Sequence, residues 1–323
     1  MRQCFSIGLF ALLVLSLPGC GGFRDTKPQL PGNLDTLCMP DYASGFEMYR
    51  YDSSTLLRIV NPWQGADSVS QWVFLSRDDE KPPKGFAGET IDVPVRRIVC
   101  MSSSYVAFLE ALGADSTICA ISGTGYIWSD KVRNRIAGGE IAEAGFDNSL
   151  NFEKLVALKP DVVFLYGLTG KNAVTDKLHE LGLKTVYIGD YVENNPLGRA
   201  EWITVFGEFT GRRELARTLF DSISNEYNRA KALVSGVEKR PEVMLNAPWQ
   251  DSWFVPGDRS YMVRLLEDAG GNYACRGVDS DQSRPISTET AFVAASQSDF
   301  WLSPGTATSL AELNAMNPRF GSI

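Results

Sequence analysis

The sequence holds a set of aromatic side chains at loop positions, where they could contact a ligand. Aromatic rings at such positions can stack on a large, flat and partly apolar molecule, although some amphipathic aromatic residues instead cover the edge of a core. The six candidates lie in two separate parts of the chain: Tyr126, Trp128, Tyr166 and Tyr191 in the first, and Trp249 and Trp253 in the second. Their density predicts a binding site for a bulky organic ligand.

Polar candidates accompany these aromatic residues. Ser103 and Ser104 stand at the start of a predicted helix, where hydroxyl groups and free backbone amides are available to a ligand. Arg259 and Arg284 could pair with anionic groups of that ligand, or could simply be solvated. With only two such arginines, the predicted site has a limited capacity for negative charge.

The sequence has few of the residues that direct metal binding or catalysis would need. A metal site needs several histidine and carboxylate ligands, whereas His179 is the single histidine and lies in a predicted surface helix. An exported hydrolase, which remains an alternative, needs a nucleophile with a nearby base. The chain has no GxSxG motif and no histidine placed to serve Ser103 or Ser104. We therefore expect no catalytic residue, no metal ligand and no cofactor.

The overall composition is that of an acidic globular protein. A length of 323 residues favours about two domains with sizeable cores. The formal net charge of −8 argues against nucleic acid as a partner, because binding to a phosphate backbone requires a basic surface.

The first 20 residues are typical of a signal peptide. Met1 and Arg2 give a positive start, and residues 7–17 form an apolar run that is too short to span a bilayer. The run ends in "LPGC", which resembles a bacterial lipobox whose cysteine, Cys20, carries the lipid. A plain signal peptide with an incidental cysteine is the alternative. The lipobox predicts a protein that is anchored by lipid to a membrane, in the periplasm or at the cell surface.

Residues 21–95 are expected to form a tether followed by a small β appendage. Residues 23–37 are rich in proline, glycine and polar side chains. The runs "FEMYRY", "LLRIV" and "QWVFL" between residues 46 and 75 then predict an antiparallel meander. The role of this meander is left open, and a surface interaction module built on it is a second alternative function.

From residue 96 the chain alternates short buried strands with helices, which predicts parallel α/β architecture. A first lobe covers residues 96–198, connecting helices cover residues 199–236, and a second lobe covers residues 237–323. The connecting region contains a predicted helix over residues 212–234, with Leu215, Leu219, Ile223 and Tyr227 as its apolar stripe. The second lobe is shorter than the first, so we expect it to be truncated.

Four cysteines remain after the signal peptide: Cys38, Cys100, Cys119 and Cys275. Cys100 and Cys119 lie in two predicted strands that could be neighbours. A disulfide and a pair of small buried thiols are both compatible with that placement.

One helix–strand unit occurs twice. "NFEKLVALKPDVVFL" starts at Asn151, and the looser copy "STETAFVAASQSDFWL" starts at Ser287. In each copy a residue suited to an N-cap precedes a glutamate, Glu153 or Glu289, in the first turn of the helix. Because a carboxylate there interacts favourably with the helix dipole, capping alone could explain both glutamates.

The region from residue 97 to about residue 316 resembles the class III substrate-binding proteins of ABC importers. The resemblance rests on "RIVCMSSSYVAFLEALGA", "ICAISG", "NFEKLVALKPDVVFL", "LGLKTVYIGD", "WFVPGDRSYMVRLLEDAGGNYA" and "ISTETAFVAASQSDFWL". It implies two Rossmann-like lobes with mostly parallel sheets, joined by a long helix, with a ligand cleft between them. The stretch "PLGRAEW" and the meander resemble a subgroup whose ligand is not specified by the sequence.

The same resemblance implies function and partners. The family delivers iron-siderophore complexes, haem and cobalamin to a membrane permease that works with an ATPase. Glu153 and Glu289 match the family's glutamates that dock against permease arginines. A corrinoid or a hydroxamate complex is favoured over a tri-anionic catecholate, because Arg259 and Arg284 are the only arginine candidates. We expect a monomer that binds a metal chelate and has no enzymatic activity.

Overall fold

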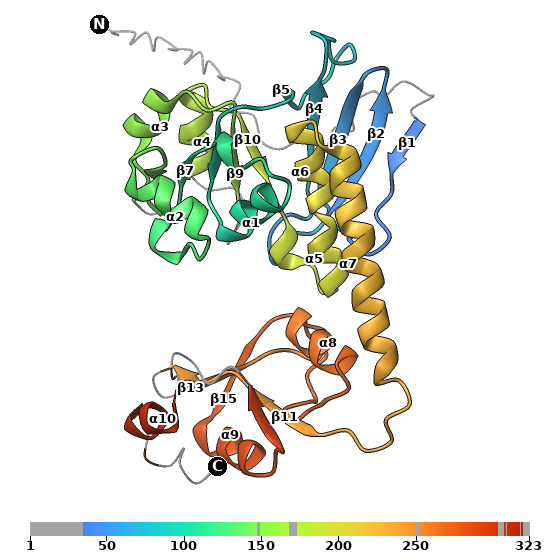
Figure 1. Cartoon of the computed structure of the whole chain (residues 1–323), viewed down its shortest axis with the longest axis vertical. Helices are drawn as coiled ribbons and strands as arrows, with labels where there is room; N and C mark the ends of the chain where they lie inside the picture. Colours follow the sequence, from blue (N-terminus) through green and yellow to red (C-terminus); the bar gives the residue numbers. More distant parts are fainter. Residues whose placement is uncertain are drawn as a thin grey trace, which may run out of the picture.

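The computed structural model describes residues 35–146, 149–167, 173–249, 252–302, 307, 309–316 and 318. They form two α/β lobes that one long helix connects, with an additional β-sheet beside the first lobe (Figure 1). The predicted fold class is thus confirmed. Within the described residues, no helix is long and apolar enough to cross a membrane.

The first lobe is built on a five-stranded sheet with the order β10-β9-β6-β7-β8, in which every pairing is parallel. Its strands are short, and all of them except the edge strand β8 are completely buried, as expected when helices cover both faces. They are β6 (Ile98–Cys100), β7 (Ile118–Ile121), β8 (Ala142–Glu143), β9 (Val162–Leu165) and β10 (Thr185–Tyr187). The helices are α1 (Ser103–Ala111), α2 (Asp130–Ala137), α3 (Phe152–Leu158) and α4 (Ala173–Glu180).

Local capping explains where two of these helices begin. The Ser102 side chain accepts a hydrogen bond from the backbone N–H of Ser104 at the start of α1. The Asn151 side chain accepts one from the N–H of Lys154 at the start of α3. Helix α3 ends at Lys159 in a left-handed conformation, directly before Pro160, as the sequence predicted.

The predicted meander forms the centre of a second five-stranded sheet, the N-terminal sheet, with the order β1-β2-β3-β4-β5. The strands are β1 (Asp35–Cys38), β2 (Phe46–Tyr51), β3 (Ser54–Val60), β4 (Ser70–Ser76) and β5 (Glu89–Asp92). The first four pair antiparallel, and β5 is parallel to β4.

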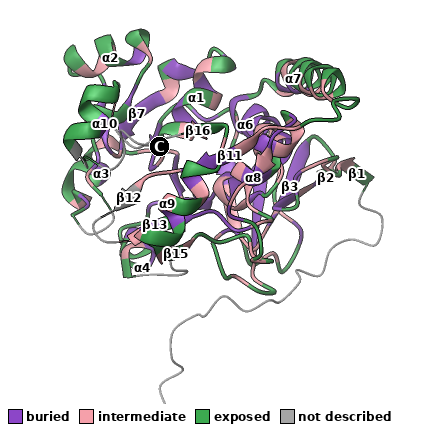
Figure 2. Cartoon of the chain, turned by 90° about the horizontal axis from the view of Figure 1, so that it is seen from below, coloured by how far each residue is buried: buried purple, intermediate pink, exposed green. Residues whose placement is uncertain are grey.

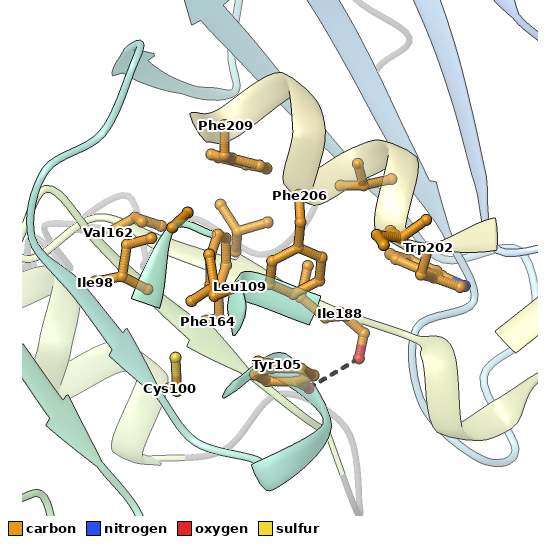
Figure 3. Close-up of a cluster of buried hydrophobic side chains, with 14 of the residues drawn as sticks. Ile98, Cys100, Tyr105, Leu109, Val162, Phe164, Ile188, Trp202, Phe206 and Phe209 are labelled. Carbon is orange, nitrogen blue, oxygen red and sulfur yellow. Dashed lines mark hydrogen bonds between the residues drawn. The ribbon is translucent and has the colours of Figure 1, made fainter. Parts of the chain in front are cut away.

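The N-terminal sheet and the first lobe share one hydrophobic core. Helix α5 (Pro196–Glu201) leads into α6 (Ile203–Thr210), and every residue of α6 is buried. Phe206 and Phe209 pack against Phe164 (Figure 3), with ring centroids about 5 Å apart. Trp202 packs against Phe46 of the sheet. The sheet is therefore an integral layer of the first lobe's core.

A glutamine also joins the N-terminal sheet to the parallel sheet. Gln71 on β4 donates from Nε2 to the carbonyl of Thr185 over 2.9 Å, and its Oε1 accepts from the N–H of Tyr187 at the same distance. Its amide thereby satisfies two backbone groups at the outer edge of β10, where a sheet normally exposes unpaired groups.

Helix α7 (Arg213–Leu233) connects the lobes and confirms the predicted connecting helix. Its buried residues are Ala216 and Phe220, whereas Leu215 and Ile223 of the predicted stripe are more than 40% exposed. The predicted stripe is therefore only partly correct: Leu219 packs against the core and Tyr227 is half-buried, but the buried face is centred on Ala216 and Phe220. Helix α7 approaches α6 closely there, since a Cβ on Gly207 would lie 2.5 Å from that of Ala216. Most of the helix surface faces solvent (Figure 2).

The second lobe contains two three-stranded sheets. The parallel sheet consists of β11 (Glu242–Leu245), β14 (Asn272–Tyr273) and β16 (Phe300–Leu302). The antiparallel sheet, which was not predicted, consists of β12 (Pro248–Trp249), β13 (Ser252–Val255) and β15 (Arg284–Ser287). Helices α8 (Tyr261–Asp268), α9 (Thr288–Ser296) and α10 (Leu310–Met316) complete the described part.

All four cysteines of the described residues are free thiols, including Cys100 and Cys119 on the paired strands β6 and β7. The Cys119 thiol donates to the carbonyl of Ile98 over 3.3 Å. Burial raises the pKa of both thiols. They are small apolar core residues in this structure.

Candidate ligand-binding cleft

A cavity of about 710 Å³ lies between the two lobes. Most of its lining comes from the loop between β3 and β4, the segment after β10, and the start of α8 with the loop before β15. Ser44, Gly45, Asn246 and Pro256 complete the lining. Its size is within the range of small-molecule sites. This cavity, called the cleft below, is the candidate site.

The first lobe contributes the short helix η3 (Asp190–Val192) at the carboxyl end of β10. Tyr191 lines the cleft, and its ring meets that of Tyr166 edge to face at 6.3 Å. The Tyr191 hydroxyl donates to the carbonyl of Gly167 and accepts from the backbone N–H of Gln64 over 3.2 Å. This location agrees with the rule that ligands bind at the carboxyl ends of parallel strands.

Asp190 is a buried carboxyl group directly beside the cleft. Burial raises its pKa to about 6, although a hydrogen bond from Ser104 and the charge of Arg199 act in the opposite direction. Because the native protein binds this proton more readily than the unfolded chain, the ionised group lowers stability above pH 6. That penalty disappears as the pH falls toward the ordinary carboxyl range.

We expect Asp190→Asn to change the pH dependence of stability. The free energy of unfolding of the wild type, relative to the variant, should rise by about 1–3 kcal/mol between about pH 7.5 and about pH 4.5. Denaturant titrations of both proteins across this range measure the difference. A difference that stays constant with pH would contradict the assignment.

One cation–π contact connects the lobes across the cleft. The Arg199 guanidinium of α5 lies 4.0 Å from the ring centroid of Tyr261 at the start of α8, and both residues line the cleft. Burial lowers the pKa of Arg199. Contacts of this kind contribute more when they are shielded from water.

The connecting helix is also fixed to the second lobe. Asp268, at the end of α8, accepts a hydrogen bond from the Tyr227 hydroxyl over 2.9 Å and an ion pair from Lys231 at 2.8 Å. Burial opposes ionisation of Asp268, but the bonds from Lys231 and Tyr227 outweigh it and lower its pKa. Together with Arg199 and Tyr261, this anchor holds the two walls of the cleft in a defined geometry.

The other candidates of the first lobe do not line the cleft. Ser103 is exposed and Ser104 half-buried at the start of α1, where Ser104 approaches Asp190. Tyr126 is 70% exposed and Trp128 is 90% exposed, on the loop that follows β7. Both remain available to a ligand, at the carboxyl end of a strand but outside the cleft as the structure shows it.

The candidates of the second lobe require a correction. Trp253 is completely buried, and its indole N–H donates to the carbonyl of Leu245 over 3.1 Å. It is therefore a core residue, because β13 of the antiparallel sheet packs on β11 of the parallel sheet. Arg259 pairs with Asp279 at 2.8 Å, and neither Arg259 nor the half-buried Arg284 lines the cleft. The side chain of Trp249 lies outside the described residues.

The sequence interpretation missed the contribution of the N-terminal sheet. Trp63 and Gln64, in the loop after β3, line the cleft together with Tyr261 and Arg199. Carboxamides are common in its lining: Asn61, Gln64, Asn194, Asn246 and Gln282. The only signal in the sequence was an aromatic and an amide side chain within the turn "NPWQG".

Glu153 and Glu289 occupy equivalent places on the two lobes. Each is exposed in the first turn of its helix, α3 or α9. The N-cap residues are Asn151 and Ser287, whose side chains accept the expected backbone hydrogen bonds. Neither carboxylate is used for capping, so both are accessible to a partner.

Among the described residues, no group of three or more histidine, cysteine or acidic side chains could hold a metal ion. His179 is exposed on α4, with Nε2 at 2.6 Å from the Thr185 hydroxyl and 3.2 Å from a Glu89 oxygen. It belongs to the contact between α4 and its neighbours and lies away from the cleft lining.

Comparison with known proteins gives consistent results. A family model described as periplasmic binding protein matches residues 98–318. An uncharacterised lipoprotein of Methanocaldococcus jannaschii is 26% identical, over 99% of this chain and 84% of its own length.

Solved structures show the same fold. The periplasmic haem-binding protein HutB of Vibrio cholerae aligns with a TM-score of 0.57 and 19% identity, over 70% of this chain and 84% of that chain. The periplasmic vitamin B12-binding protein BtuF of the same organism aligns with a TM-score of 0.50 and 12% identity, over 71% and 84%.

Proposed function

Because the chain belongs to the periplasmic binding protein family, whose members bind solutes and are not enzymes, we propose that it is the substrate-binding component of an ABC importer. It captures a metal chelate, either an iron-siderophore or a corrinoid, and delivers it to a membrane permease that works with an ATPase. The single observation that carries this proposal is the 710 Å³ cleft between two lobes joined by one rigid helix.

The chemistry of the cleft supports an uncharged or weakly charged chelate. Its lining combines carboxamides with the rings of Trp63, Tyr191 and Tyr261. Arg199 is the only arginine that lines it among the described residues, and that arginine is engaged with Tyr261. Such a lining offers hydrogen bonds and flat surfaces but little compensation for a tri-anionic ligand. A corrinoid or a hydroxamate complex therefore fits better than a catecholate complex.

The protein acts as a lipid-anchored monomer outside the cytoplasmic membrane. Support comes from the lipobox-like "LPGC" and from a relative that is named as a lipoprotein. Cys20, the proposed lipid-bearing residue, lies outside the described residues. Glu153 and Glu289 are the proposed contacts to the permease.

Ligand titration tests the proposed class. Cyanocobalamin, haem and ferrichrome, a ferric hydroxamate, are added to the full chain while the intrinsic fluorescence of its seven tryptophans is recorded. We expect quenching by one chelate, accompanied by stabilisation of about 2.7 kcal/mol when free ligand reaches about 100 times its Kd. If none of the three changes fluorescence or thermal stability, the proposed ligand class is wrong.

A further inference from the structure

The loop between β3 and β4 reaches the cleft from the N-terminal sheet, beside the parallel sheet of the first lobe. Asn61, Trp63, Gln64, Gly65 and Ala66 of this loop all line the cavity. They belong to the N-terminal sheet, which precedes the residues matched by the family model.

Specific contacts hold this loop against the first lobe. Trp63 forms an isolated parallel bridge with Gly167, at the end of β9, and its ring packs edge to face on Tyr187 at 5.2 Å. A Cβ at Gly167 would lie about 3 Å from the Trp63 side chain, so the close approach depends on glycine. The bond from the Gln64 N–H to the Tyr191 hydroxyl fixes the next residue.

Two buried carboxylates fix the connection between β1 and β2 of the N-terminal sheet. Glu201 accepts hydrogen bonds from the backbone N–H groups of Asp41, Tyr42 and Ala43, each over 2.8 Å. Glu193 accepts from the N–H groups of Ser44 and Gly45 over 2.9 to 3.0 Å.

The carboxylates come from the same segment that forms the first lobe's wall of the cleft. Glu193, Ser44 and Gly45 themselves line the cavity. The N-terminal sheet is therefore tied to the cleft on both sides of the β2–β3 pair: at residues 41–45, before β2, and at residues 61–66, after β3.

We propose that the β3–β4 loop is a third wall of the ligand site and that it determines specificity. Gln64 hydrogen-bonds a polar substituent of the chelate, Trp63 offers the exposed part of its ring, and Ala66 leaves room for the ligand. Since the carboxamides of this wall carry no charge, they favour a chelate whose periphery bears amide or hydroxyl groups. This inference rests on the proposed function.

Two substitutions test the third wall, in the full chain and with the chelate that the wild type binds among cyanocobalamin, haem and ferrichrome. Ala66→Phe places a ring in the cleft and should raise the Kd by more than about tenfold. Gln64→Ala removes one hydrogen bond and should raise it about three- to tenfold.

Matched controls are available at exposed residues that do not line the cleft. Asp67→Phe adds the same ring at the neighbouring exposed residue, which does not line the cleft. Gln297→Ala removes an exposed glutamine in the second lobe. Both should bind with the wild-type Kd, and unchanged thermal unfolding of all four variants establishes that they are folded.

The outcomes separate the two proposals. If the wild type binds a chelate and both cleft variants bind it equally well, the third wall is refuted while the proposed function stands. If the wild type binds none of the three chelates, the ligand class fails, and this inference fails with it. If the Kd for the chelate rises in Ala66→Phe and Gln64→Ala but not in the two control variants, the third wall is supported.

Discussion

Replacing both Glu153 and Glu289 with alanine should nearly abolish import while leaving ligand affinity unchanged. The two exposed carboxylates stand at equivalent helix starts, one on each lobe. Paired with arginines of a permease, each would form a charge-assisted contact at the interface, and losing one such contact costs about 2 kcal/mol or more. The double variant should therefore reduce transport by well over about tenfold, and each single variant less.

The substitution should have little effect on the isolated protein. Each glutamate interacts with its helix dipole, which contributes only about 0.3–1 kcal/mol. Transport into cells or vesicles that carry the intact importer is the measurement, with ligand titration of the same variants alongside. The double variant Glu214→Ala with Glu238→Ala removes the same charge from exposed sites at the start of the connecting helix and in the loop that follows it. Undiminished transport by the Glu153 and Glu289 double variant would show that these glutamates only stabilise the starts of their helices and do not contact the permease.

The alternation of strands and helices was predictable because parallel strands have a distinct pattern. Runs such as Val162–Leu165 are buried on both faces and so appear as continuous apolar segments. Capping residues and prolines then located the helix ends, as at Asn151 and Pro160. These signals are local, and each depends on a few neighbouring residues.

Contacts between distant segments were not predictable in this way. The buried face of α7 follows from a close approach between Gly207 and Ala216, for which hydropathy gives no indication. Trp253 is buried because the unpredicted β13 pairs with β15, about 30 residues further along the chain.

The cleft illustrates the same limit. Tyr191 was identified because it follows a predicted strand, and strand ends gather at one edge of a parallel sheet. Trp63 belongs to a turn in a different sheet, and only the packing of that sheet on the first lobe brings it to Tyr187. The amide-rich character of the site thus depends on pairings that span more than 100 residues, such as Gln64 with Tyr191.

Glu201→Ala should destabilise the protein more than any surface substitution. The carboxylate is 1% exposed and accepts three backbone hydrogen bonds from residues 41–43. Burial raises its pKa, although the three N–H groups act in the opposite direction. Alanine would leave these donors without their acceptor, and we expect the free energy of unfolding to fall by about 3–5 kcal/mol.

Chemical denaturation measures this loss, and Glu238→Ala, at an exposed glutamate in the loop after α7, should change stability by less than about 0.5 kcal/mol. Glu201→Gln keeps the shape and one acceptor oxygen but turns an amide donor toward N–H groups. Its loss of stability should therefore lie between those of Glu201→Ala and the exposed control variant. A loss below about 1 kcal/mol for Glu201→Ala would mean that water replaces the carboxylate without strain. If the large loss is observed, chelate binding should weaken under native conditions as well, because the same contacts set the position of the sheet whose β3–β4 loop lines the cleft.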